Sequence, residues 1–198
     1  IATLVITPIG IFAQETTEDA VVLEEVVMPR LLDYGENLPD HYGTVGIDDF
    51  VKLIIKNEDL VILDVREVAE VEETGVIKGA IHIPMRELGE NLALLPDLDA
   101  TIVVVCKGGF RATIAMTALH VLGYENAQVL VGGMSAWFGE DLPVVEEPAM
   151  VEAMDIPEDI DPLLVEYVAD HMTNLPEGWG GVKPVNLFEE MFDAMPDL

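Results

Sequence analysis

The stretch Thr101 to Thr113 (TIVVVCKGGFRAT) decides the fold, because an apolar run passes through a cysteine into a glycine-containing loop and then into a helical pattern. The run Thr101 to Val105 predicts a short buried strand. The apolar residues within 112–122 recur at helical spacing and predict a helix after the loop. Strand followed by helix is typical of a parallel sheet covered by helices.

Other segments repeat this alternation. Buried strands are predicted at 60–63, which ends at Asp64, and at 128–131, and a helix is predicted at 50–55. The expected fold is therefore an α/β three-layer sandwich with a central, mainly parallel sheet and helices on both faces. Ligands of such sheets bind beyond the carboxyl ends of the strands, where Asp64 and Cys106 both fall.

The charge balance excludes some classes of partner. The 198 residues contain 38 Asp plus Glu and 9 Lys plus Arg, which gives a net charge of −29. A field this negative repels phosphate backbones and anionic lipid, so binding to nucleic acid or to a membrane surface is not expected. The apolar fraction of 51% separates the chain from acidic disordered tails and supports a folded core.

The only cysteine is either a buried hydrophobic residue or a reactive thiol, because one cysteine makes neither an internal disulfide nor a four-thiolate zinc site. Gly108 and Gly109 allow positive φ, so successive N–H groups can turn toward the sulfur. Lys107, Arg111 and the start of the following helix add positive charge, which favours thiolate over thiol. A reactive Cys106 is the preferred interpretation.

Four segments in order resemble the rhodanese-like sulfurtransferases, and the resemblance spans about 45–145. These segments are Leu60 to Glu67 (LVILDVRE), Gly79 to Pro84 (GAIHIP), Cys106 to Arg111 (CKGGFR) and Gly132 to Trp137 (GGMSAW). One segment departs from the family pattern, since Gly75 to Ala80 reads GVIKGA where the family usually has G-H-I-P-G-A.

The resemblance implies a role for each residue of the loop. Cys106 would be the nucleophile that takes a sulfane sulfur as a persulfide, and the loop Lys107, Gly108, Gly109, Phe110 and Arg111 would bind the donor. Its amides would surround the outer sulfur, while Lys107 and Arg111 would hold the donor's anionic group. Asp64 and Arg66 would brace the loop rather than perform chemistry. No metal and no organic cofactor is expected.

The same resemblance implies a reaction class. Phosphatases that share this fold use a longer C-x5-R loop, whereas this chain has C-x4-R, a smaller loop suited to a sulfur atom. A basic residue after the cysteine suits thiosulfate better than mercaptopyruvate, so Lys107 favours a small anionic sulfur donor, with a thiol or cyanide as acceptor. The alternatives are a non-catalytic binding module and a sulfur carrier or persulfide sensor.

The N-terminal part of the chain indicates export. Residues 1–13 (IATLVITPIGIFA) are uncharged and apolar and are interpreted as the remnant of a signal peptide. Residues 14–37 are interpreted as an acidic spacer, and 38–147 as the rhodanese-like domain. The expected location is periplasmic, extracellular or cell-surface.

The C-terminal part indicates a duplication. Residues 148–174 are acidic and proline-containing and are interpreted as a linker. Leu175 to Ala194 then echoes Leu38 to Asn57 at an offset of 175 − 38 = 137 residues, so 175–198 is interpreted as the start of a second, similar domain. The four histidines are scattered without paired spacing, and no metal site is expected from them.

Overall fold

The computed structural model describes residues 23–57 and 59–175. The interpretations of 1–13 as a signal remnant and of 175–198 as the start of a second domain therefore fall almost wholly outside the described residues. Within the described ranges, no helix has the length and apolar character needed to cross a membrane.

Five parallel strands form the central sheet, in the spatial order β1-β5-β4-β2-β3. The register pairs Asp64 with Val105 and with His82, so β2, β3 and β4 end at the same edge. Cys106 follows β4 at this edge. The strands are β1 (Thr44–Val45), β2 (Val61–Asp64), β3 (Ile81–His82), β4 (Ile102–Val105) and β5 (Ala127–Leu130).

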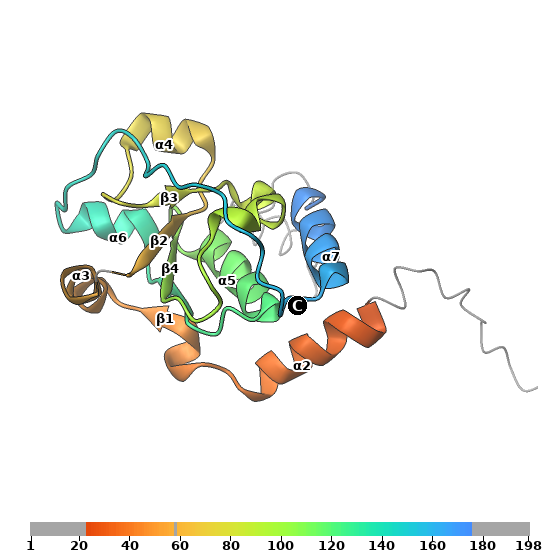
Figure 1. Cartoon of the computed structure of the whole chain (residues 1–198). Coiled ribbons are helices and arrows are strands. Elements are labelled where there is room, and N and C mark those ends of the chain that lie inside the picture. The colour runs from red at the N-terminus through yellow and green to blue at the C-terminus, as the bar shows by residue number, and fades with distance from the viewer. Residues whose placement is uncertain (1–22, 58, 176–198) are drawn as a thin grey trace, which may run out of the picture.

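Helices cover both faces of the sheet (Figure 1). Alternate residues of the strands face two separate apolar clusters, as expected for strands buried on both sides. One cluster includes residues of α3 (Ile47–Lys56), α4 (Val68–Thr74) and α6 (Gly133–Gly139). The other includes residues of α5 (Phe110–Leu122), α7 (Pro162–Thr173) and the 3-10 segments η3 (Met85–Glu87) and η4 (Gly89–Leu94). The predicted three-layer α/β sandwich is confirmed.

The predicted elements are present with small shifts in their bounds. The three predicted strands correspond to β2, β4 and β5, and the helices predicted at 50–55 and 112–122 correspond to α3 and α5. β1 and β3 were not predicted from the sequence. Each strand has only two residues, which is too short for alternating apolar residues to be recognised.

The interpretation of 148–174 as a linker was wrong for its second half. α7 occupies 162–173 and buries Leu164, Val168 and Met172 against the domain. Asp161 caps the helix by accepting a hydrogen bond from the Leu163 amide at 2.9 Å. The acidic and proline composition hid this helix, because its apolar residues recur every fourth position along one face only.

The segment before α7 also lies on the domain. The amide of Ala149 donates to the carbonyl of Ala80 at 2.8 Å, and the amide of Met154 donates to the carbonyl of Ala93 at 2.7 Å. Figure 1 shows this segment passing over the domain between α6 and α7. The chain therefore stays on the domain until at least Leu175, which is 6% exposed.

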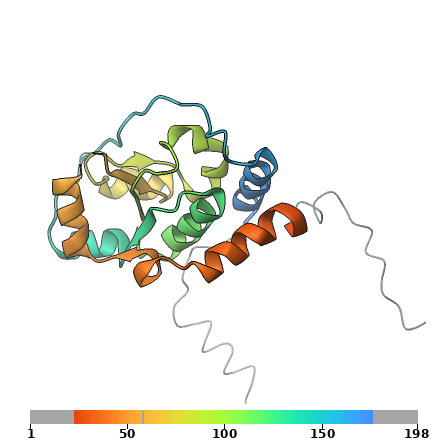
Figure 2. The same ribbon diagram turned by 60° about the horizontal axis from the view of Figure 1, so that its bottom comes forward.

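The acidic spacer predicted for 14–37 is likewise partly folded. A π-helical turn, η1 (Leu23–Val27), leads into α2 (Met28–Glu36), and Val27 is buried in the core. The ring of Tyr34 in α2 stacks on His120 of α5, with the ring centroids 4.9 Å apart. A 3-10 segment, η2 (Asp40–Gly43), then connects α2 to β1. Figure 2 shows α2 and α7 at the same end of the molecule.

Candidate active site

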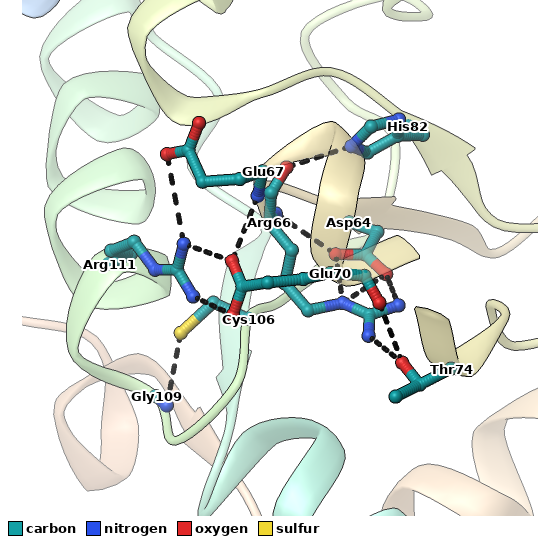
Figure 3. Close-up of polar contacts among 9 residues, drawn as sticks. All are labelled: Asp64, Arg66, Glu67, Glu70, Thr74, His82, Cys106, Gly109 and Arg111. Atoms are coloured by element: carbon teal, nitrogen blue, oxygen red, sulfur yellow. Dashed lines mark hydrogen bonds and ion pairs between the residues drawn. The ribbon is translucent and has the colours of Figure 1, made fainter. Parts of the chain in front are cut away.

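Cys106 lies directly after β4, and α5 begins four residues later at Phe110. The cysteine is 1% exposed, and its Sγ accepts a hydrogen bond from the amide of Gly109 at 3.1 Å (Figure 3). Gly109 has φ +104°, a conformation that residues with a side chain rarely adopt. The loop therefore turns the Gly109 N–H group toward the sulfur, as predicted, whereas Gly108 does not have the positive φ that was predicted for it.

The start of α6 holds the loop backbone. The amide of Met134 donates to the Cys106 carbonyl at 2.8 Å, and the amide and hydroxyl of Ser135 donate to the Lys107 carbonyl at 2.9 and 2.8 Å. In a trans peptide the N–H points opposite to the C=O, so the amides of Lys107 and Gly108 point away from α6. The segment Gly132 to Trp137 thus determines how the loop presents its amides.

Gly133 makes this contact possible. A Cβ atom at position 133 would lie 2.2 Å from the Cys106 carbonyl oxygen, and the residue has φ +54°. Only glycine fits both the space and the backbone conformation. Trp137, in the same helix, packs against α3, with the ring centroids of Trp137 and Phe50 5.9 Å apart. Its Nε1 donates a hydrogen bond to the Pro143 carbonyl.

Arg111 is paired with the carboxylate of Glu70, a residue that was not among the predicted site residues. Its Nη1 and Nη2 donate to Oε2 and Oε1 of Glu70 at 2.6 and 2.8 Å, and Nη1 lies 3.8 Å from Oε1 of Glu67 (Figure 3). The contact between Arg111 and a donor anion therefore stays a prediction. Because the guanidinium already binds a carboxylate, its charge is largely compensated.

The ion pair between Arg111 and Glu70 shifts the pKa of both groups. The hydrogen bond from Arg111 lowers the pKa of Glu70 below its ordinary value of 4.5, although partial burial opposes this. The same contact raises the pKa of Arg111. Glu70 also accepts a hydrogen bond from the Glu67 amide at 3.0 Å, which closes a capping box at the start of α4. Glu70 thus joins the first turn of α4 to the first turn of α5, the helix that follows the thiol.

Asp64 and Arg66 form a buried ion pair at the end of β2, with side chains 0% and 2% exposed. The Arg66 guanidinium donates to both Asp64 oxygens, to the Thr74 hydroxyl at 2.8 Å and to the Gly75 carbonyl at 2.7 Å. The Arg66 carbonyl in turn contacts Nε2 of His82 at 2.8 Å. These contacts tie both ends of α4, and hence Glu70, to the sheet.

Lys107, Gly108 and Phe110 are exposed, whereas Gly109 is buried. Lys107 borders a cavity of about 190 Å³. The cavity brings together two basic residues, two acidic residues and several others from β2–α4 and from the start of α6. Its lining consists of Arg66, Glu70, Glu73, Thr74, Lys107, Met134, Ser135 and Phe138.

Sequence reasoning missed Glu70, Glu73, Thr74 and Ser135 at this site. The spacing of Glu67 and Glu70 is that of a capping box and could have predicted the start of α4. No local signal links Glu70 to Arg111, which lies 41 residues further along the chain. Within the described residues, no group of three or more His, Cys, Asp and Glu side chains is arranged to hold a metal ion.

Comparison with known proteins finds a family match over the central part of the chain. The sequence profile of the rhodanese-like domain matches residues 47–140. The chain is 31% identical over 99 residues to thiosulfate sulfurtransferase/rhodanese-like domain-containing protein 3 of Mus musculus, covering 44% of this chain and 63% of the mouse protein. It is 31% identical over 119 residues to a candidate sulfur carrier protein of Bacillus subtilis, YrkF, covering 59% of this chain and 63% of that protein.

One solved structure is matched over its own full length. The chain is 34% identical to a rhodanese-related protein from Thermoplasma volcanium, covering 54% of this chain and 100% of that one, with a TM-score of 0.48. The chain spans about 63% of the length of the two curated relatives above. The fold and the ordered motifs define a rhodanese-like domain, and the chain belongs to the rhodanese-like family.

Proposed function

We propose that the protein is a sulfurtransferase that moves a sulfane sulfur from thiosulfate, or a similar small anionic donor, to a thiol or cyanide acceptor. The observation that carries this proposal is the hydrogen bond from the Gly109 amide to Sγ of Cys106 at 3.1 Å, in a loop held from behind by α6. Amides fixed in this way stabilise negative charge on sulfur without further reorganisation. The sulfurtransferase and sulfur-carrier relatives support the same chemistry.

The reaction consists of two displacements. The Cys106 thiolate attacks the outer sulfur of thiosulfate, the S–S bond of thiosulfate breaks, and sulfite leaves with the bonding electron pair. Cys106 then carries a persulfide. Cyanide or an acceptor thiolate attacks the outer sulfur, forming thiocyanate or an acceptor persulfide and returning the Cys106 thiolate. No external oxidant or reductant is needed.

We assign the donor contact to Lys107, and the charges beside the thiol support this choice. Arg66 is compensated by Asp64, and Arg111 by Glu70. Lys107 is exposed at the cavity, and its amino group has no ion pair among residues 23–57 and 59–175. Its ammonium group is therefore the uncompensated positive charge at the cavity that would attract an anionic donor.

The test is the intact mass of the full chain before and after thiosulfate, and again after cyanide. Wild type should gain the mass of one sulfur atom and lose it with cyanide, whereas Cys106→Ala and the nearly isosteric Cys106→Ser should gain nothing. A gain that persists in either variant would overturn the assignment to Cys106. Loading by mercaptopyruvate but not by thiosulfate would overturn the donor assignment alone.

A sulfur carrier is the second candidate, and the 1% exposure of Cys106 favours it, because a buried persulfide is shielded from stray thiols. Both candidates load Cys106, so turnover separates them. A catalyst releases thiocyanate in large molar excess over protein when thiosulfate and cyanide are both supplied. A carrier releases about one equivalent and is then reloaded slowly.

Export of the protein is also a proposal and rests on the apolar segment 1–13 alone. Expression with the native upstream sequence, followed by cell fractionation and N-terminal sequencing of the product, tests it. Recovery of the uncleaved chain from the cytosol would contradict export.

A further inference from the structure

The cavity beside the Cys106 loop is lined by polar side chains, most of which already have partners. Arg66 is paired with Asp64, and Glu70 with Arg111. The hydroxyl of Thr74 accepts a hydrogen bond from Arg66 and donates one to the Glu70 carbonyl, both at 2.8 Å (Figure 3). The hydroxyl of Ser135 donates to the Lys107 carbonyl at 2.8 Å.

Two charged groups of the lining remain uncompensated, the ammonium of Lys107 and the carboxylate of Glu73. Both side chains are exposed, and neither takes part in an ion pair within residues 23–57 and 59–175. A ligand that enters the cavity would therefore meet one free positive charge and one free negative charge.

The two charges do not serve the same substrate. Lys107 attracts the anionic donor of the proposed reaction, whereas the carboxylate of Glu73 repels it. Glu73 therefore opposes the first half of the reaction. A second substrate with a positive charge, entering after sulfite has left, would be attracted to Glu73.

The size and the apolar part of the cavity limit this second substrate. The volume of about 190 Å³ corresponds to about six water molecules at the density of liquid water. Met134 and Phe138 of α6 provide apolar surface beside the charged groups. A small molecule with a short methylene chain and a charged end fits these properties.

We propose that Glu73 selects the sulfur acceptor, and that this acceptor is a small aminothiol, a thiol that carries an ammonium group. The inference rests on the proposed sulfurtransferase activity and names its acceptor. The ammonium pairs with Glu73, the methylene groups contact Met134 and Phe138, and the thiol reaches the persulfide on Cys106. The net charge of −29 acts in the same direction, because it attracts cationic thiols and repels anionic ones.

The transfer step is balanced without a further reactant. The acceptor thiol releases its proton to solvent, and its sulfur forms a bond to the protonated outer sulfur of the Cys106 persulfide. The bond between that outer sulfur and Sγ of Cys106 breaks, and its electron pair stays on Sγ as the thiolate. The product is the persulfide of the aminothiol.

The test isolates the acceptor step. The full chain is loaded with thiosulfate and freed of excess donor, and the loss of the extra sulfur is followed by intact mass after a thiol is added. The two thiols are cysteamine and 2-mercaptoethanol, which differ mainly in an ammonium against a hydroxyl group, at equal thiolate concentration. Cysteamine should unload the wild type faster than 2-mercaptoethanol does.

The ratio of the two rates is then compared between variants, which cancels the different basicity of the two thiols. Glu73→Gln should lower this ratio about fivefold, the upper range for an exposed ion pair. The matched control is Glu72→Gln, which removes the same charge from the neighbouring exposed residue outside the cavity lining. It should leave the ratio unchanged.

Three outcomes overturn the proposal. An unchanged ratio in Glu73→Gln would mean that Glu73 does not select the acceptor. An equal fall in Glu72→Gln would mean that only the overall negative charge acts. Faster unloading of the wild type by the anionic 3-mercaptopropionate than by cysteamine would mean that Lys107 binds the acceptor.

Failure of the proposed function gives a different result, because loading involves no acceptor. A chain that gains no sulfur from thiosulfate contradicts the proposed donor, and loading with inorganic polysulfide then permits the same comparison of thiols. A chain that neither reagent loads contradicts the proposed function itself.

Binding at Glu73 is also measured without sulfur chemistry. In a Cys106→Ser background, ethanolamine should shift the backbone amide NMR signals of Thr74 and Ser135 further than it does when Glu73→Gln is added. Ethylene glycol, at the same ionic strength, is the uncharged control. Equal shifts with and without Glu73→Gln would overturn the proposal.

Discussion

Both carboxylate oxygens of Glu70 bind the guanidinium of Arg111, at 2.6 and 2.8 Å, and so connect the helix after β2 to the first turn of the helix after the thiol. The pair has two consequences. It positions the start of α5 relative to α4, and it removes most of the positive charge that the C-x4-R loop would otherwise offer to an anion.

Replacing Glu70 by Gln should lower the KM for thiosulfate, because Arg111 would then carry an uncompensated charge beside the thiol. A change of about 1 kcal/mol is expected, which is roughly fivefold in KM. Steady-state kinetics of thiocyanate formation measure it. Glu72→Gln, on the exposed side of the same helix, is the control and should change little. An increase in KM in the Glu70 variant would show that Arg111 must be held to bind the donor.

The same pair should make stability depend on pH. Arg111 lowers the pKa of Glu70 in the folded state, so the pair stabilises the protein fully above the unfolded value near 4.5. This stabilisation is lost as the pH falls through the lower folded-state pKa. Urea unfolding of wild type and Glu70→Gln between pH 7 and 3 should give a constant difference above 4.5 that shrinks below it. A difference that grows on acidification would contradict the assignment.

Replacing Lys107 by Ala should raise the KM for thiosulfate roughly fivefold to tenfold, or about 1 to 1.4 kcal/mol, because the exposed positive charge at the cavity is lost. The effect should diminish in high salt, which screens exposed charges. Lys56→Ala, in the last turn of α3, is the control. An unchanged KM would remove Lys107 from donor binding while leaving Cys106 as the nucleophile.

Replacing Gly133 by Ala should disturb the sulfur loop. The new Cβ would lie 2.2 Å from the Cys106 carbonyl oxygen, and the residue would be held at φ +54°. A loss of about 2 kcal/mol in the free energy of unfolding is expected, together with a lower kcat. Gly139→Ala, at the other end of α6 with no atom within 4 Å of its Cβ, is the matched control. Equal stability of the two variants would show that α6 does not constrain the loop.

Replacing Asp64 by Asn should destabilise the protein by about 3 kcal/mol, because Arg66 would remain buried without its counter-charge. Denaturant unfolding measures the loss. Asp49→Asn breaks an exposed pair with Lys52, in which both side chains are more than half exposed, and should have no measurable effect. Similar losses of unfolding free energy in both variants would mean that burial does not explain the stabilisation by the Asp64–Arg66 pair.

Local features of the site were predictable from sequence. The apolar run Ile102 to Val105 was predicted to be buried and is, the cysteine follows its carboxyl end, and Gly109 marked a backbone turn with positive φ. The observed hydrogen bond from the Gly109 amide to Sγ follows from these neighbours in the chain. The prediction was wrong for α7. The acidic, proline-containing composition indicated a linker, and the helical spacing of only three buried apolar residues did not outweigh it.

The sequence by itself determined the parallel α/β order, the loop that surrounds Cys106 and the glycines that this loop requires, since these depend on residues within a few positions of one another. Only the tertiary structure decided that Glu70 compensates Arg111, that Ser135 holds the Lys107 carbonyl and that α7 covers the domain. These contacts join residues 41, 28 and, for Thr173 of α7 with Arg86, 87 positions apart. Side-chain chemistry allows many such pairs, and the packing of helices on both faces of the sheet selects which of them form.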